Sequence, residues 1–276
     1  MSRSQIAVNE TRLVPFLKWA GGKRWFVANH GDLFPRAYGR YIEPFLGSAA
    51  VFFFLQPPKA ILTDVNDELI NAYTVIRDHW QPLGKALARH QALHNDEYYY
   101  AVRATPACSG IDGAARFIYL NRTCWNGLYR VNQRGEFNVP RGTKNSVLLD
   151  SDDFERLSST LKSAKIKAAD FEDSIEMAKR GDLLFVDPPY TTMHNHNGFI
   201  KYNDKIFSWD DQIRLRDAIV RADARGALIV MTNANHKSLR EIYSGFNLRS
   251  LSRQSVLAGV ANARGETEEL LVTNLG

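Results

Sequence analysis

Short apolar runs that end in an acidic residue recur along this sequence, and they constrain the fold more than any other feature. Asp64 follows the apolar and β-branched residues 60–63, and Asp187 follows four apolar residues at 183–186. Such runs are typical of short buried strands. Residues 66–75 then have the apolar spacing of a helix. Strand and helix therefore alternate, which predicts an α/β fold with a largely parallel sheet.

The strand pattern stops near residue 67 and returns after about residue 150. Residues 79–113 have a polar, helical pattern, and residues 121–142 are rich in Asn, Arg and Gly. Two stretches in this second region, 128–131 and 136–139, are expected to form the arms of a β-hairpin. We expect a main α/β domain at 13–66 and 151–276, an inserted and mainly helical domain at 67–150, and a loose tail at 1–12. Later strands are expected at 165–168, 227–232, 246–250 and 270–273.

Composition excludes several classes of protein. The chain has 276 residues, of which 45% are hydrophobic and 24% charged, as in ordinary globular proteins. Its formal net charge of +5 is compatible with nucleic acid and equally with a mildly basic surface. Two cysteines do not make a disulfide framework. No apolar run approaches the roughly 18 residues of a membrane span, so we expect a cytoplasmic protein with no membrane partner.

The predicted strand ends carry residues that suit a nucleoside. Ligands of open α/β sheets bind beyond the carboxyl ends of the strands. Gly47, in the stretch EPFLG, allows the backbone to approach a ligand, and Asp64 suits ribose hydroxyl groups. Asp170 and Phe171 suit the amino edge and the face of adenine. Each residue has a structural alternative, since Asp64 could cap a helix and Phe171 could belong to the core.

Phosphate-binding motifs are missing from these strand ends. The sequence contains neither GxxxxGK[ST] nor GxGxxG, so ATP and dinucleotides are not indicated. A nucleoside cofactor without phosphates favours S-adenosylmethionine.

The acidic end of the run at 183–186 opens the sequence Asp187-Pro188-Pro189-Tyr190, which we name the DPPY segment (residues 187–190). The N6 lone pair of adenine is delocalised into the ring, and two acceptors aimed at its N–H bonds would expose it. Asp187 offers a carboxylate and Pro188 a carbonyl, while Pro189 has no N–H and stiffens the chain. Tyr190 can stack on a base. The structural alternative is a rigid turn after a strand.

Several stretches together resemble Dam-type (D12 class, alpha group) DNA adenine-N6 methyltransferases. The DPPY segment resembles the catalytic motif of amino-methyltransferases that act on DNA. FLKWAGGK at 16–23, YIEPFLGSAAVF at 41–52 and LTDVNDELI at 62–70 resemble the cofactor-binding stretches of this family. LNRTCWNGLYRVNQRGEFNVPRG at 120–142 resembles its target-recognition hairpin. The motifs occur in the family's order.

This resemblance implies a Rossmann-like, S-adenosylmethionine-dependent methyltransferase sheet with an inserted target-recognition domain. The residues implied to be catalytic are Asp187, Pro188, Pro189 and Tyr190. Those implied to bind S-adenosylmethionine are Trp19, Lys23, Glu43, Pro44, Phe45, Gly47, Asp64, Asp170, Phe171 and Asp187. Those implied to bind DNA are Lys18, Asn126, Leu128, Arg130, Asn132 and Pro140. Further phosphate contacts are expected from Arg122, Arg134, Arg141 and Lys144.

The resemblance also implies a substrate. Arg130 would read a guanine through O6 and N7, which is the commonest specific contact in the major groove. The expected site is GATC or a related sequence containing GA, in double-stranded DNA, with the target adenine flipped out of the duplex. A partner restriction endonuclease and action as a monomer are further expectations. One departure is that no aromatic residue directly follows Gly142, where family members can fill the space left by the flipped base.

Two other functions fit the sequence less well. A methyltransferase for an RNA base or a protein glutamine commonly has Asn before the two prolines, and the inserted hairpin argues against it. A protein that recognises DNA without modifying it is disfavoured by the intact Asp187, Tyr190, Trp19, Lys23 and Asp64. His194 and His196 lack further spaced ligands, so no metal is expected.

Overall fold

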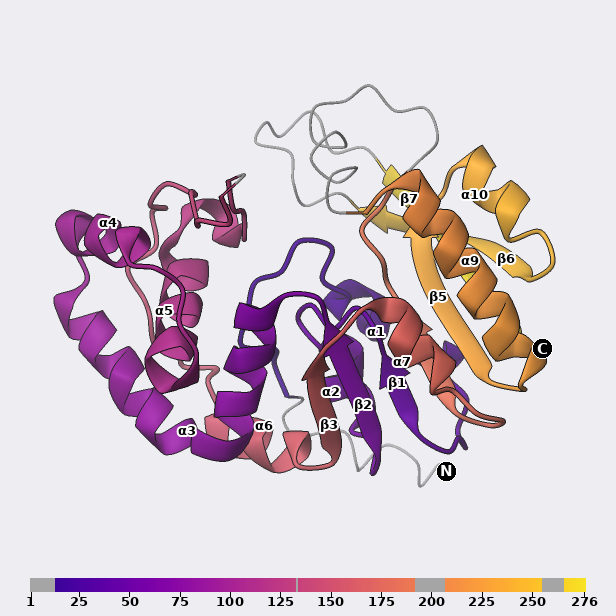
Figure 1. Cartoon of the computed structure of the whole chain (residues 1–276), viewed down its shortest axis with the longest axis horizontal. Coiled ribbons are helices and arrows are strands. Elements are labelled where there is room, and N and C mark those ends of the chain that lie inside the picture. The colour runs from indigo at the N-terminus through magenta and orange to yellow at the C-terminus, as the bar shows by residue number, and fades with distance from the viewer. Residues whose placement is uncertain (1–12, 133, 192–206, 255–265) are drawn as a thin grey trace, which may run out of the picture. The chain divides into compact units, whose positions relative to one another are not determined.

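The computed structural model describes residues 13–132, 134–191, 207–254 and 266–276 (Figure 1). The chain divides into two compact units, and each is described by itself. Unit 1 contains the described residues up to Leu33 together with Leu46–Pro58 and Asp64–Ala168. Unit 2 contains Phe34–Phe45, Lys59–Thr63 and the described residues of Ala169–Gly276.

A seven-stranded sheet confirms the expected α/β class. Its order is β3-β2-β1-β4-β5-β7-β6. Strand β1 runs parallel to β2 and β4, and β4 runs parallel to β5, whereas β7 pairs antiparallel with both β5 and β6. The strands are β1 (Tyr41–Glu43), β2 (Ala60–Asp64), β3 (Ala164–Ala168), β4 (Leu183–Val186), β5 (Leu228–Ala234), β6 (Asn247–Gln254) and β7 (Glu266–Thr273).

The core of unit 2 explains why its strands are so apolar. All four residues of β4 are buried, as expected for a central parallel strand covered on both faces. Leu184 and Val186 of β4 belong to one apolar cluster with Ile219 of helix α9 (Trp209–Ala224). Helix α7 (Phe171–Glu176) packs on α9 (Figure 1), and the short helix α10 (Lys237–Ile242) follows β5. This packing fixes the ends of β4 and β5.

Unit 1 is mainly helical. Helix α3 (Asp67–Leu93) packs along α5 (Gly110–Thr123), and α4 (Asp96–Ala104) also packs on α5. The sequence predicts a helix over 66–75 and a separate helical region from 79, but α3 continues through both with non-helical backbone at His79. Pro82 lies one turn later and cannot donate the helical hydrogen bond to residue 78, which explains the bend. The unit also contains α1 (Arg24–His30), α2 (Ala50–Leu55) and α6 (Phe154–Leu161).

The two arms of the predicted hairpin at 128–139 are paired, but they do not form regular strands. Val131 pairs with Phe137 in an isolated bridge, and the backbone N–H of Asn138 donates to the Arg130 carbonyl at 3.2 Å. The Asn132 side chain accepts from the N–H groups of Arg134 and Glu136. Side-chain bonds of this kind compete with a strand ladder, which explains why pairing does not extend.

Some expectations have no outcome here. The domain boundaries at 13–66, 67–150 and 151–276 stay a prediction. The tail at 1–12, Gln133, and the segment with His194 and His196 lie outside the described residues. Within the described part of the chain, no helix is long and apolar enough to cross a membrane.

Candidate functional site

Three predicted acidic residues lie where neighbouring parallel strands end. Tyr41 of β1 is in register with Ala60 of β2 and with Leu183 of β4. Glu43 and Asp64 are the last residues of β1 and β2, and Asp187 follows β4 directly. Since β1 and β4 of unit 2 are parallel, Glu43 and Asp187 lie at the edge of the sheet at which ligands of α/β proteins bind.

Asp64 holds the loop before α2. Its carboxylate accepts from the backbone N–H of Gly47 at 3.1 Å and of Asn66 at 3.0 Å. Burial raises the pKa of Asp64, and these N–H donors oppose that rise because they favour the ionised form. The alternative that Asp64 caps the next helix is wrong, since the Asn66 side chain caps α3 by accepting from Leu69.

Gly47 and Trp19 meet closely within unit 1. Gly47 has φ +46°, and a Cβ added there would lie 2.8 Å from Trp19 Cδ1. The Trp19 ring also stacks on Tyr129, with 5.6 Å between centroids, and the Tyr129 hydroxyl donates to Glu68. Two predicted cofactor residues of unit 1, Trp19 and Asp64, thus lie against Gly47.

Lys23 is also held in unit 1. Its side chain is buried, and its Nζ donates to the Gly21 carbonyl at 2.8 Å. Lys23 immediately precedes α1, so the loop of residues 16–23 leads directly into that helix.

The predicted adenine-binding pair has structural partners in unit 2. Asp170 caps α7 by accepting from the Glu172 N–H, and it pairs with Arg214 at 3.0 Å. Phe171 is buried, stacks on Phe45, and lies under the Arg214 guanidinium at 4.3 Å. These contacts give both residues a structural role. Their binding of adenine stays a prediction.

Glu43 and Pro44 are buried at the end of β1. The Glu43 carboxylate accepts from the Tyr41 hydroxyl at 2.9 Å. Burial raises the pKa of Tyr41, and the neighbouring Glu43 carboxylate raises it further. The predicted cofactor role of Glu43 and Pro44 stays untested by these contacts.

Both ends of the DPPY segment are tied to the sheet. Asp187 accepts from the Thr232 hydroxyl at 2.8 Å, and the Tyr190 hydroxyl donates to Glu269 at 2.7 Å. Thr232 lies in β5 and Glu269 in β7, so both partners come from strands far along the chain. Neither residue is among those expected from the sequence to be functional. Thr232 follows four apolar residues in β5, and Glu269 ends a polar run that precedes apolar residues in β7, so the sequence signal of each is weak.

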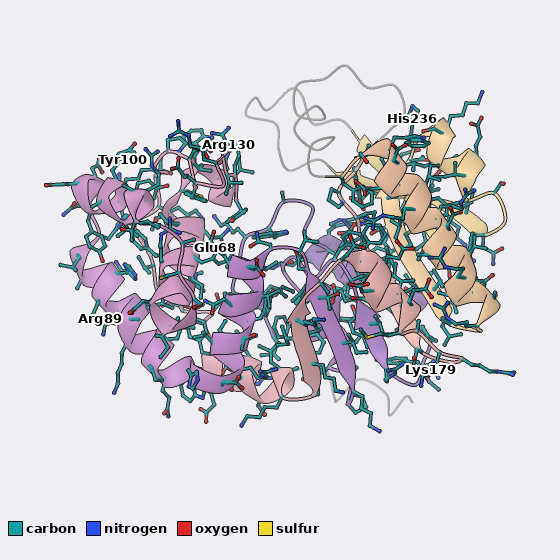
Figure 2. All side chains as sticks on the ribbon, in the orientation of Figure 1. Glu68, Arg89, Tyr100, Arg130, Lys179 and His236 are labelled. Carbon is teal, nitrogen blue, oxygen red and sulfur yellow. The ribbon has the colours of Figure 1, made fainter. Side chains whose placement is uncertain are left out.

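The residues expected to bind DNA belong to unit 1. Arg130 is exposed, and its Nε donates to Asn138 at 2.9 Å (Figure 2). Asn132 donates from its side chain to Glu136 at 2.7 Å. Asn126 has φ +55° in the short η2 turn (Trp125–Gly127). Lys18, Asn126 and Pro140 are exposed and Leu128 is half-buried.

One expected phosphate contact is wrong. The Arg122 guanidinium is buried, pairs with Asp152 at 2.6 Å, and donates to the carbonyls of Phe16 and Val147. A buried, fully engaged guanidinium is not offered to a phosphate. Arg141 pairs with Asp96 at 2.8 Å, whereas Arg134 and Lys144 are exposed.

Two features bear on other chemistry. Among the residues that the structure describes, no group of three His, Cys, Asp or Glu side chains comes together as a metal site. Cys124 is buried, which raises the pKa of its thiol to about 11. As a neutral thiol, Cys124 serves for packing.

Comparison with known proteins agrees with this geometry. A family model described as D12 class N6 adenine-specific DNA methyltransferase matches residues 19–257. The type II methyltransferase M1.LlaDCHI of Lactococcus lactis subsp. cremoris is 36% identical, over 97% of this chain and 98% of the relative. The type II methyltransferase M.MjaIII of Methanocaldococcus jannaschii is 35% identical, over 94% and 98%. A DNA adenine methylase of Haemophilus influenzae is 30% identical, over 93% and 92%.

The contact between Gly47 and Trp19 generates a prediction. Gly47→Ala places a Cβ against the Trp19 ring, and Gly21→Ala is a matched control because Gly21 has φ +75° with nothing within 4 Å of an added Cβ. Left-handed backbone costs either variant about 1–2 kcal/mol. Overpacking adds about 1–3 kcal/mol for Gly47→Ala alone. Denaturant unfolding measures both losses of stability, and equal losses would contradict the assigned contact.

Proposed function

The chain belongs to the D12 class N6 adenine-specific DNA methyltransferase family, and from this premise we propose that it methylates N6 of a flipped adenine in duplex DNA, at GATC or a related site containing GA. The methyl donor we propose is S-adenosylmethionine. The observation that carries the proposal is the DPPY segment, whose Asp187 directly follows the buried strand β4 and is fixed by Thr232.

The chemistry of the DPPY segment suits an exocyclic amine. The Asp187 carboxylate and the Pro188 carbonyl are acceptors that can receive the two N6–H groups of adenine. Accepting both would draw the nitrogen toward tetrahedral geometry and expose its lone pair. Pro188 and Pro189 restrict the backbone of the segment, so the acceptors are preorganised rather than assembled during the reaction. Tyr190 would stack on the base.

The residues of the strand ends fit S-adenosylmethionine. The Asp64 carboxylate accepts hydrogen bonds from the backbone N–H groups of Gly47 and Asn66. A carboxylate at this position suits ribose hydroxyl groups. Gly47 lacks the Cβ that would meet Trp19, which keeps the backbone of its loop close to that ring. Trp19, Lys23, Glu43, Pro44, Phe45, Asp170 and Phe171 would complete the binding residues. When bound, the cofactor would supply a methyl group activated by a sulfonium.

The hairpin at 128–139 would recognise the base sequence of the DNA. The bond from Arg130 Nε to Asn138 restrains the guanidinium, and its Nη groups can donate to O6 and N7 of a guanine. Asn126, Leu128, Asn132 and Pro140 would contact neighbouring bases or backbone. Adenine N6 is paired and stacked in a duplex, so the target base has to leave the stack, at a cost of a few kcal/mol.

We propose two features of the biological setting, the first of which is supported by the names of the relatives. The proteins from L. lactis and M. jannaschii are named type II methyltransferases. We therefore propose a restriction endonuclease of the same specificity as a partner at the level of the system. We also propose that a single chain reads one site, as a monomer, on DNA in the cytoplasm.

Methyl transfer to defined duplexes tests the proposal. Purified protein and labelled S-adenosylmethionine are incubated with a duplex carrying GATC and with one in which that site is scrambled. We expect N6-methyladenine in the first duplex only, and loss of the reaction in Asp187→Ala. Label in both duplexes would refute the site, and normal turnover by Asp187→Ala would refute the mechanism.

The pH dependence of DNA binding tests the role of Lys18. Partial burial and the nearby Lys144 together lower the pKa of Lys18 to about 8. A DNA phosphate would raise the pKa in the complex, so the contribution of Lys18 is complete below about pH 8 and is lost as the pH rises above it. We expect duplex affinity, measured by fluorescence anisotropy, to fall by up to about tenfold per pH unit above that value.

Two variants serve as controls for this titration. Lys144→Met removes a like charge and should move the fall in affinity to higher pH. Lys18→Met should bind more weakly and remove the dependence. An unchanged pH profile in Lys18→Met would contradict the assignment of Lys18 to DNA.

A further inference from the structure

The DPPY segment is anchored by two side chains that belong to neither of its own flanking elements. Thr232 Oγ1 donates to Asp187 Oδ1 at 2.8 Å, at the first residue of the segment. Glu269 Oε2 accepts from the Tyr190 hydroxyl at 2.7 Å, at the last residue. Asp187 and Tyr190, the two residues expected to act on the base, are therefore both hydrogen-bonded to the sheet.

Thr232 and Glu269 lie close together on paired strands. In the antiparallel register of β5 and β7, Thr232 is opposite Leu271, and Ala234 is opposite Glu269. Thr232 is 0% exposed and Glu269 is 4% exposed. Side chains buried in a packed sheet have few alternative rotamers, so both anchors are rigid.

We propose that Thr232 and Glu269 are positioning residues for methyl transfer: Thr232 orients the Asp187 carboxylate, and Glu269 orients the Tyr190 ring. This inference rests on the proposed function of the DPPY segment. Neither residue touches the substrate, and each acts through the residue that it bonds.

The chemistry of each bond explains its effect. A carboxylate can rotate about its Cβ–Cγ bond, and a hydroxyl that donates to one oxygen fixes the direction in which its lone pairs face. Hydrogen bonds to ionised groups are stronger than neutral ones, so this restraint is substantial. A tyrosine ring held at its hydroxyl has both ends fixed, because its Cβ is set by the backbone. Small displacements of a catalytic group lower the rate steeply.

Thr232→Val removes the first anchor while keeping the shape of the side chain. We expect kcat to fall about tenfold, corresponding to about 1.4 kcal/mol, since the carboxylate is no longer fixed in the transition state. KM for DNA and for the cofactor should change by less than about twofold, because ground-state binding is not altered. Thr232→Ser keeps the hydroxyl and should restore most of kcat.

Thr273→Val is the matched control. Thr273 also lies in the sheet, in β7, is 6% exposed, and donates its hydroxyl to the Ile229 carbonyl at 2.7 Å. Its partner in the register is Val230, two residues before Thr232 in β5, and its hydroxyl bonds to backbone and not to the DPPY segment. It should lose stability as Thr232→Val does, with kcat within about twofold of the wild type. An equal fall of kcat in both variants would show that Thr232 is only structural and overturn the proposal.

A double-mutant cycle tests the second anchor and does not depend on whether Thr232→Val folds. Tyr190→Phe and Glu269→Leu each remove one partner of the same hydrogen bond. Each should lower kcat, and the double variant should remain within about twofold of the more impaired single one. Unchanged kcat in Tyr190→Phe, or independent effects that multiply, would overturn the role of Glu269.

Asp187→Ala separates the two hypotheses. If this variant still transfers methyl groups, the proposed function of the DPPY segment fails. If it is inactive while Thr232→Val behaves like Thr273→Val, the proposed function stands and the positioning role of Thr232 fails.

Discussion

The hydrogen bond from Thr232 to Asp187 is the interaction on which the candidate site depends. This bond gives a partner to the Asp187 carboxylate, which directly follows a wholly buried strand. A charge next to an apolar core needs such a partner. Strand β4 has to run parallel between β1 and β5 for Asp187 to reach Thr232, so the order of the sheet and the chemistry of the site are linked. The Pro188-Pro189 pair then carries the chain away in a restricted conformation toward Tyr190.

A second acid plays the same part in unit 1. Asp64 ends a buried strand, and backbone N–H groups stabilise its ionised form against the effect of burial on its pKa. The bond to Gly47 fixes the loop that lies against Trp19, so one carboxylate organises a set of residues from separate parts of the sequence. At both strand ends, hydrogen-bond partners fix the carboxylate that ends or follows a buried strand.

Much of this arrangement follows from local pattern in the sequence. The apolar run before Asp187 predicts β4 because a fully buried strand tolerates no polar residue. Partners distant in the chain are not predictable in this way, and Thr232 and Glu269 were missed because a strand pattern does not say which strands will be neighbours. Arg122 was misassigned for a related reason, since its partner Asp152 is 30 residues away. The hairpin was located correctly, but its Asn side chains limit the ladder in a manner that propensity alone does not reveal.

Under the proposed function, the target adenine leaves the duplex to reach the DPPY segment. Fluorescence of 2-aminopurine tests this step directly, because stacking quenches this adenine analogue. With the analogue at the target position, emission should rise when the protein binds, and with the analogue at a neighbouring position it should change little. Asp187→Ala should still give the rise, since extrusion does not require the carboxylate. Unchanged emission at the target position, under conditions in which the natural duplex is methylated, would show that the target base is not extruded.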